Sequence, residues 1–340
     1  MHFINISKII FSKIIDFTGF YKHKIDSFNI RNNNRSWLIL MYHRVISDSS
    51  HDPFNLGMCV TDKAFEKQLI YLKKHYKITK LSEVINGYNS GIKLQDNTLS
   101  LTFDDGYEDN LKIALPLLIK HNVPATIFIS TGGLEKNRLF WWDRLINAFK
   151  QTKKTSLDLK LIDINSSRKL SLNKYKIRKS IIDLQELLWK HTIPQINEIV
   201  SQIEEALEVE NNNQSLRLTR DEIKLLHEAG IEIGAHTVSH PNLTLLSENN
   251  LVQELKSCKS ELESIIDSPV KGFAFPGGRG NEVIRKMIAE AGYEYAVSTD
   301  KGINFDDTDH YCLLRIGMPN TSISDFKRCL SNIAQSDASN

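Results

Sequence analysis

The chain has 340 residues, of which 41% are hydrophobic, and a formal net charge of +2. Its length and apolar content suffice for one large folded domain or two ordinary ones. The near-neutral charge excludes binding to nucleic acid or another polyanion through a bulk electrostatic field. The cysteines form no C-x-x-C pair, which is typical of reduced thiols in a cytoplasmic protein.

Residues 1–36 are predicted to be an N-terminal amphipathic segment followed by a polar linker. Charged residues interrupt the apolar run within residues 3–24, which leaves it too short to span a bilayer. The helix either packs on the rest of the protein or lies on the inner face of the membrane, as Lys22 and Lys24 would favour. The apolar residues at helical spacing are Ile6, Ile10, Ile14, Phe17 and Tyr21.

The run from Leu38 to Tyr42 is apolar throughout, which predicts a strand buried on both faces. His43 follows this strand, either as a capping or core histidine or as a residue at the mouth of a site. Thr61 or Asp62 begins an amphipathic helix. Further strands and helices alternate along the chain, and this alternation predicts a parallel sheet.

The strand predicted at Leu99 to Phe103 ends abruptly at Asp104, Asp105 and Gly106. Adjacent carboxylates repel each other, so a pair at a strand end is costly unless a cation lies beside it. A bound metal ion would remove the conflict by taking one carboxylate as a ligand and leaving the other as a base. The alternative is a solvated Asp-Gly turn without chemistry.

The next strand, Val123 to Ile129, precedes an interruption of the alternating pattern at about residues 136–217. This segment is predicted to be a helical insertion that projects over the end of the sheet where the strands finish. Its helices are expected at residues 173–190 and 195–207, separated by Pro194.

His236 and His240 follow a second short strand, residues 231–235. Four residues apart, they lie on one face of a helical turn or converge from a tight loop, and in either case both reach one cation. The ends of parallel strands share one rim, so these histidines are expected beside Asp105. One aspartate and two histidines leave coordination positions open, as a catalytic metal requires.

The residues at Thr102 to Tyr107 and at His236 to His240 resemble the first two motifs of the polysaccharide deacetylases, the NodB-homology group or carbohydrate esterase family 4. The similarity extends from about residue 38 to 319. Segments 41–45 and 140–143 resemble members that act in bacterial surface-polysaccharide biosynthesis. The resemblance implies a catalytic domain over residues 37–335 with a distorted, partly open (β/α) barrel of this type and the helical insertion.

The resemblance also implies a metal-dependent hydrolase that removes the N-acetyl group from an amino sugar of a surface polysaccharide or its lipid-linked precursor. Asp105, His236 and His240 would hold a divalent metal, most commonly Zn²⁺. Asp104 would act as general base and the backbone N–H of Tyr107 would stabilise the oxyanion. Trp141 would either stack on a sugar ring or anchor the insertion to the barrel.

Two positions depart from the family pattern. The arginine expected two residues before Pro276, which braces the base, is Ala274, and Arg279 is the candidate to replace it. The histidine expected as general acid is Arg315, which would bind an anionic group or brace Asp104.

No counterpart of the family's fourth motif occurs in residues 299–309. The general acid is therefore unassigned, with His43 and His310 as candidates. Two alternative functions remain open: a deformylase or other amidase on a lipid-linked amino sugar, and a glycan-binding family member with little catalytic activity.

Overall fold

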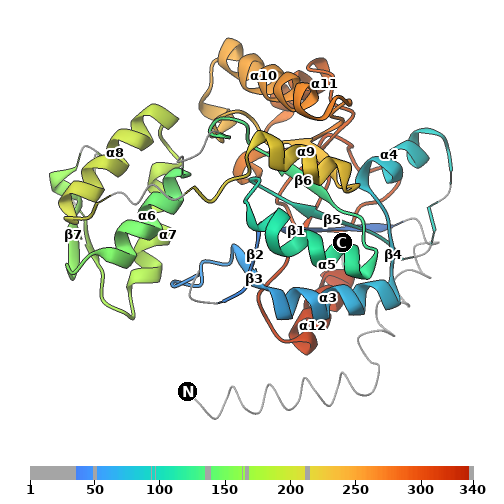
Figure 1. The fold of residues 1–340 in the computed structure, drawn as a ribbon. Helices are drawn as coiled ribbons and strands as arrows, with labels where there is room; N and C mark the ends of the chain where they lie inside the picture. Colours follow the sequence, from blue (N-terminus) through green and yellow to red (C-terminus); the bar gives the residue numbers. More distant parts are fainter. Residues whose placement is uncertain are drawn as a thin grey trace.

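The computed structural model describes residues 36–48, 52–92, 94–95, 97–134, 139–162, 164, 168–210 and 215–336 (Figure 1). Its main sheet is parallel, with the strand order β11-β10-β9-β6-β5-β1-β12 and β4 beside β5. The strands of this sheet are β1 (Trp37–Tyr42), β4 (Lys77–Ile78), β5 (Thr98–Phe103), β6 (Thr126–Ile129), β9 (Glu232–Ala235), β10 (Gly272–Ala274), β11 (Tyr295–Val297) and β12 (Ile316–Gly317).

The sheet curls until its two end strands approach each other. At one end β12 pairs with β1 through Ile316 and Leu40. Just before β12 the chain bridges β11, where Leu313 pairs with Val297. The closure therefore depends on an irregular segment instead of a full strand pair, which confirms the predicted distorted, partly open (β/α) barrel.

Helices surround the sheet, with α9, α10 and α11 on one side and α3, α5 and α12 on another (Figure 1). After β5 the chain forms a π-helical turn, Asn110–Ala114, followed directly by α5, and Pro116 lies in the first turn of α5, where a proline is tolerated. The bounds of the helices around the sheet are α3 (Asp62–His75), α4 (Leu81–Asn89), α5 (Leu115–His121), α9 (Arg220–Glu228), α10 (Glu248–Ile266), α11 (Glu282–Glu290) and α12 (Ile323–Ser336).

Two apolar clusters lie on opposite faces of the sheet, because successive strand residues point to opposite sides. Leu40 and Ile127 belong to the cluster that packs under the surrounding helices. Ile39 and Phe128 belong to the other, which also contains residues of α4. We infer that α4 closes the barrel at the end where the strands begin.

Residues 140–209 contribute a third apolar cluster, to which Tyr107 of the barrel also belongs. Figure 1 shows this insertion as a separate lobe beside the barrel. Pro194 lies in the first turn of α8, where a proline is tolerated, so it begins this helix instead of separating two helices. The insertion consists of α6 (Trp141–Gln151), α7 (Ile177–Leu188), α8 (Ile193–Ala206) and the hairpin of β7 (Ser156–Asp158) and β8 (Lys169–Ser171).

Two further strands, β2 (Arg44–Ile46) and β3 (Cys59–Thr61), form a small parallel pair after β1. Residues 3–24, for which an amphipathic helix is predicted, lie outside the described residues. Within the described ranges, no helix has the length and apolarity needed to cross a membrane.

Candidate active site

The residues of the two predicted motifs meet because the strands that precede them, β5 and β9, are separated by a single strand, β6. Strand β6 pairs with β5 on one side and with β9 on the other. Asp104 and Asp105 directly follow β5, and His236 directly follows β9. Parallel strands end at the same rim, so these side chains arrive at one place from positions more than a hundred residues apart.

Asp105, His236 and His240 form a compact, fully buried group of candidate metal ligands. One ligand atom from each residue lies within 4.8 Å of the others. The Nε2 atoms of both histidines are 3.4 Å from Oδ1 of Asp105. The structure therefore brings together the three side chains that the sequence assigned to a metal ion.

The hydrogen bonds around this group fit a cation. Nδ1 of His236 is 2.8 Å from the carbonyl oxygen of Ala274 and must donate to it. Nε2 of neutral His236 then directs a lone pair toward Asp105. Among the described residues, Oδ2 of Asp105 and Nδ1 of His240 are buried without a hydrogen-bond partner. A divalent cation held by the carboxylate of Asp105 and by Nε2 of both histidines would remove the repulsion between their lone pairs.

Burial lowers the pKa of His240, and the neighbouring Asp105 does not fully reverse this effect. The imidazole therefore stays neutral, as a metal ligand must. Burial alone would raise the pKa of Asp105, but the two histidines outweigh it and hold that pKa well below its ordinary value. The carboxylate is ionised and ready to coordinate.

Asp104 points to a different partner. Its two oxygens accept hydrogen bonds from Nη1 and Nη2 of Arg315, each at 2.7 Å. Burial raises the pKa of Asp104, yet Arg315 outweighs burial and the net pKa is lowered. Arg315 is 0% exposed, so it braces Asp104 and is not available to an anionic group of a substrate.

The other candidate for this brace, Arg279, does not reach Asp104. It is exposed, and its guanidinium lies 5.8 Å from the centre of the Trp189 ring. Pro276 is buried in the short 3-10 turn that follows β10 (Pro276–Gly278). The position two residues before it, Ala274, contributes only the backbone carbonyl that orients His236.

Both ligand-bearing turns hold residues in the left-handed region. Asp105 has φ +76° and Gly106 has φ +80°, while Thr237 and His240 have φ +66° and +55°. Each non-glycine residue in this region costs about 1–3 kcal/mol. The histidines therefore converge from a tight loop and not from a helical turn, which settles the alternative left open by their spacing.

Glu254 of α10 holds the loop between the two histidines, a role that sequence reasoning missed. Its Oε2 accepts hydrogen bonds from the backbone N–H groups of Val238 and Ser239 at 2.8 and 2.9 Å. The Thr237 hydroxyl accepts another from the His240 N–H at 3.0 Å. A glutamate on a surface helix has no local pattern that marks such a role.

The insertion forms an aromatic wall beside His240. The centre of the Trp142 ring is 4.6 Å from that of His240, and the Trp189 ring is 5.6 Å away. Trp141 is 5% exposed and packs on Trp142 and Trp189. Its place in the insertion core favours the anchoring role over stacking on a sugar ring.

Both ends of the insertion also bind the turn that follows Asp105. At the entry, Nε1 of Trp142 donates to the Tyr107 hydroxyl at 2.7 Å. At the exit, the backbone of Glu108 donates to Leu216 and that of Leu218 donates to Gly106. Long-range pairing of this kind could not be read from the sequence.

The two histidine candidates for a general acid lie at opposite ends of the barrel. His43 follows β1 at the rim of the site and lowers the pKa of both Asp104 and Asp105. His310 stacks edge-on against Tyr88, which in turn contacts Trp37 at the start of β1. His310 is therefore too distant to serve the site.

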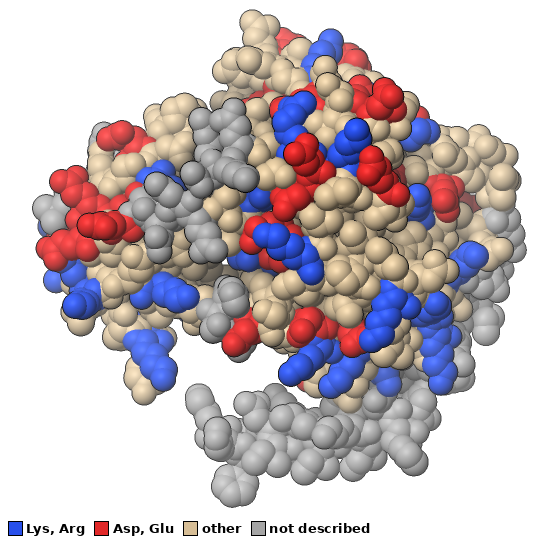
Figure 2. All heavy atoms as spheres, viewed as in Figure 1, with Lys and Arg blue, Asp and Glu red and all other residues tan. Residues whose placement is uncertain are grey.

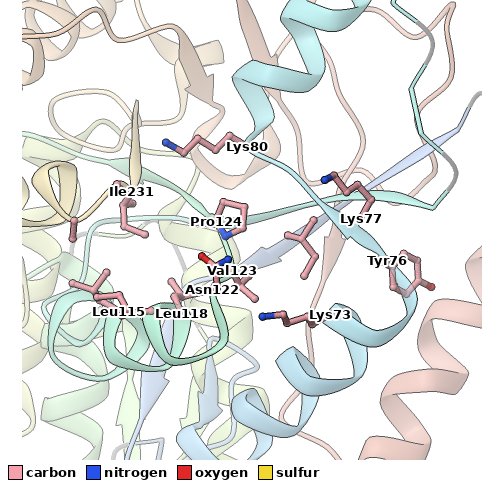
Figure 3. Close-up of a pocket in the computed structure, with 14 residues that line it drawn as sticks. Lys73, Tyr76, Lys77, Lys80, Leu115, Leu118, Asn122, Val123, Pro124 and Ile231 are labelled. Carbon is pink, nitrogen blue, oxygen red and sulfur yellow. The ribbon is translucent and has the colours of Figure 1, made fainter.

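A cavity of about 620 Å³ lies where the strands begin, at the end opposite Asp105 (Figure 3). Its lining includes Lys73, Lys77 and Lys80, as well as Val123 and Ile231, which precede β6 and β9. Figure 2 shows lysine and arginine side chains gathered over the neighbouring α3. None of the candidate catalytic residues lines this cavity.

A family model described as polysaccharide deacetylase matches residues 91–162 and 171–296. YxkH of Bacillus subtilis (strain 168), classed with the polysaccharide deacetylases, is 24% identical over 279 residues, or 82% of this chain and 70% of YxkH.

Solved structures share the fold. The Streptococcus pyogenes deacetylase PplD in complex with acetate has a TM-score of 0.59 at 20% identity, covering 88% of this chain and 98% of PplD. IcaB from Ammonifex degensii has a TM-score of 0.55 at 16% identity, covering 88% and 97% of the two chains. At these identities, the likeness establishes the architecture alone.

Proposed function

Because the chain belongs to the polysaccharide deacetylase family and is a hydrolase of that family, we propose that it removes the N-acetyl group from an amino sugar. The substrate is a bacterial surface polysaccharide or its lipid-linked precursor. The observation that carries the proposal is the buried group of Asp105, His236 and His240 with the braced Asp104 beside it.

Asp105, His236 and His240 would hold the metal ion, and their one oxygen and two nitrogen atoms suit Zn²⁺. When bound, such an ion polarises a carbonyl group and makes a water molecule acidic. The aromatic wall of Trp142 and Trp189 limits access of bulk water to His240. The donor set therefore supports a hydrolytic site.

Asp104 is the general base in this proposal. Arg315 keeps it ionised and fixes its plane, so that it is ready to accept a proton. The backbone N–H of Tyr107 has no backbone acceptor among the described residues, which leaves it for the oxygen that develops negative charge. His43, at the same rim, is the proposed donor of a proton to the leaving amine.

The proposal also includes the setting of the reaction. The protein acts in the cytoplasm, with residues 3–24 in peripheral contact with the inner face of the membrane. Lys22 and Lys24 beside an apolar helical face support this placement. A lipid-linked amino sugar would be presented at that surface.

Metal content and acetate release test the proposal together. The purified protein is expected to contain about one zinc ion per chain by elemental analysis and to release acetate from N-acetylglucosamine oligomers. A chelator should abolish release, and added Zn²⁺ should restore it. Release of formate from an N-formyl substrate without acetate release would assign the deformylase function instead. Sugar binding without release of either acid would assign the glycan-binding one.

A further inference from the structure

A second cavity, of about 480 Å³, lies where the insertion meets the barrel. Its volume is within the range of about 300–1,000 Å³ that small-molecule sites occupy. Trp142 and Tyr107 form part of its lining, and the Trp142 ring also contacts His240. The cavity is therefore separated from the metal ligands by the thickness of one side chain.

Arg44 supplies buried hydrogen-bond donors to this cavity. Its Nε is bonded to Oδ2 of Asp109 at 2.8 Å, and its guanidinium lies 4.6 Å from the centre of the Tyr107 ring. The side chain is 11% exposed. Within the part of the chain that the structure describes, its Nη1 and Nη2 have no hydrogen-bond acceptor.

Asp143 supplies acceptors on the same lining. Both of its oxygens are 3.2 Å from the Tyr107 hydroxyl, the only donor they have among the described residues. The residue is 5% exposed, and burial raises its pKa to about 7 even though Arg44 lies near. A carboxylate normally accepts several hydrogen bonds, so Asp143 has unused capacity.

The rest of α6 continues this polar lining. Asn147 and Gln151 follow Asp143 at intervals of four residues, which places the three side chains on one helix face. Lys150 and Asp52 also line the cavity. Arg44 is already paired with Asp109, and Lys150 shares the lining with Asp52 and Asp143. The lining therefore carries no excess positive charge and favours a neutral polar ligand over an anion.

We propose that this cavity is a subsite for a neutral pyranose unit of the glycan chain, next to the unit that is deacetylated. The inference rests on the proposed function and adds a second point of attachment. Sugar hydroxyls both donate and accept, so they would satisfy Asp143, Arg44 and the amides of α6 at once. Leu56, Met58 and Ile146, which also line the cavity and are partly exposed, provide apolar contact for the sugar ring.

The test compares the ratio of kcat/KM for the N-acetylglucosamine tetramer to that for the monosaccharide. Asn147→Leu removes a polar group from the cavity and should lower this ratio at least tenfold. Asn197→Leu, an exposed position on α8 that does not line the cavity, should leave it unchanged. A wild-type ratio in Asn147→Leu overturns the subsite. Gln151→Leu, at an exposed position, repeats the test if Asn147→Leu does not fold.

Calorimetric titration with the same tetramer separates this inference from the proposed function. If acetate is not released, the hydrolase proposal fails, yet tetramer binding that weakens at least tenfold in Asn147→Leu still supports the subsite. If acetate is released while both proteins bind the tetramer equally, the subsite fails and the hydrolase stands. No binding by the wild-type protein also overturns the subsite.

Discussion

Arg315 and Asp104 form a fully buried ion pair, and each depends on the other. Arg315 also donates from Nε to the carbonyl oxygen of Ser298 and from Nη1 to the Thr102 hydroxyl. Its donors therefore tie β5 to the segment that closes the barrel. Removing one partner of such a pair leaves an uncompensated buried charge.

We expect Arg315→Met to lower the free energy of unfolding by about 3–5 kcal/mol, because Asp104 loses both of its bidentate donors. Adding Asp104→Asn should recover much of this loss by removing the stranded charge. Urea denaturation of the two single variants and the double variant gives the comparison. A double variant no more stable than Arg315→Met would contradict the pairing.

Asp104→Asn tests the division of work between the two aspartates. The substitution should lower kcat by about 10²–10⁴-fold, since it removes the general base. Metal content should stay at the wild-type level, because Asp105 and the histidines are untouched. Loss of the metal in this variant would show that Asp104 is a ligand.

Asp143 should make stability depend on pH. Its pKa is about 7 in the folded protein against an ordinary value of 3.8. Between these values the folded state keeps the proton and the unfolded state does not, so stability falls as pH rises. Well above pH 7, ionisation of the buried carboxyl lowers the free energy of unfolding by about 4 kcal/mol. Below pH 4, Asp143 is protonated in both the folded and the unfolded state, and this loss of stability disappears.

Asn at position 143 does not titrate and can still accept a hydrogen bond from Tyr107. We therefore expect Asp143→Asn to unfold at a higher urea concentration than the wild type at pH 8, with a smaller difference at pH 5. Denaturation curves at the two pH values measure this. Equal urea midpoints for the wild type and Asp143→Asn at pH 8 would show that the buried carboxyl does not lower the free energy of unfolding.

At the scale of elements, close packing of β6 and β9 sets the spacing of the site. A Cβ atom added at Gly234 of β9 would lie 2.3 Å from Cδ1 of Phe128 on β6. The two strands can approach only because this position is glycine. His236 and the chain after Ile129 are held at the distance that this contact fixes.

Gly234→Ala is therefore expected to lower the free energy of unfolding by about 1–3 kcal/mol through overpacking. Gly87→Ala on α4 is the matched control, because nothing lies within 4 Å of its added Cβ. It should be neutral or raise stability by up to about 1 kcal/mol. Thermal and urea unfolding compare the two. A neutral Gly234→Ala would show that Phe128 can move aside.

Many of the helices and strands were predictable from the sequence, because apolar runs and helix caps are local signals. Thr219 and Glu222 form the capping box that a Thr-x-x-Glu sequence predicts, and Ser247 caps α10 as a serine before a helical pattern predicts. The pattern of residues 313–316 by itself predicts a strand there, but β12 is Ile316–Gly317, because Leu313 bridges β11 and Arg315 turns inward to Asp104. Contacts between distant segments decide such a boundary, and no local pattern encodes them.

At the scale of the whole molecule, the two ends of the barrel carry different groups of polar side chains. The proposed metal ligands and the insertion share the end where the strands finish. The basic α3 and the lysine-lined cavity lie toward the end where they begin (Figures 2 and 3). The sequence could predict the first grouping, because both motifs follow strands. It gave no sign of the Arg44 and Asp143 cavity, which only the docked insertion creates.

The last prediction concerns membrane binding by residues 1–35. If residues 3–24 lie on the membrane, the full chain should sediment with phosphatidylglycerol vesicles, and a chain that begins at Ser36 should not. The reason is the combination of an apolar helical face with Lys22 and Lys24, so added salt should weaken sedimentation. Vesicles of neutral phosphatidylcholine are the control. If neither chain sediments and the shorter one melts several degrees lower, the segment packs on the barrel instead. If both chains sediment equally, the basic surface of α3 makes the contact.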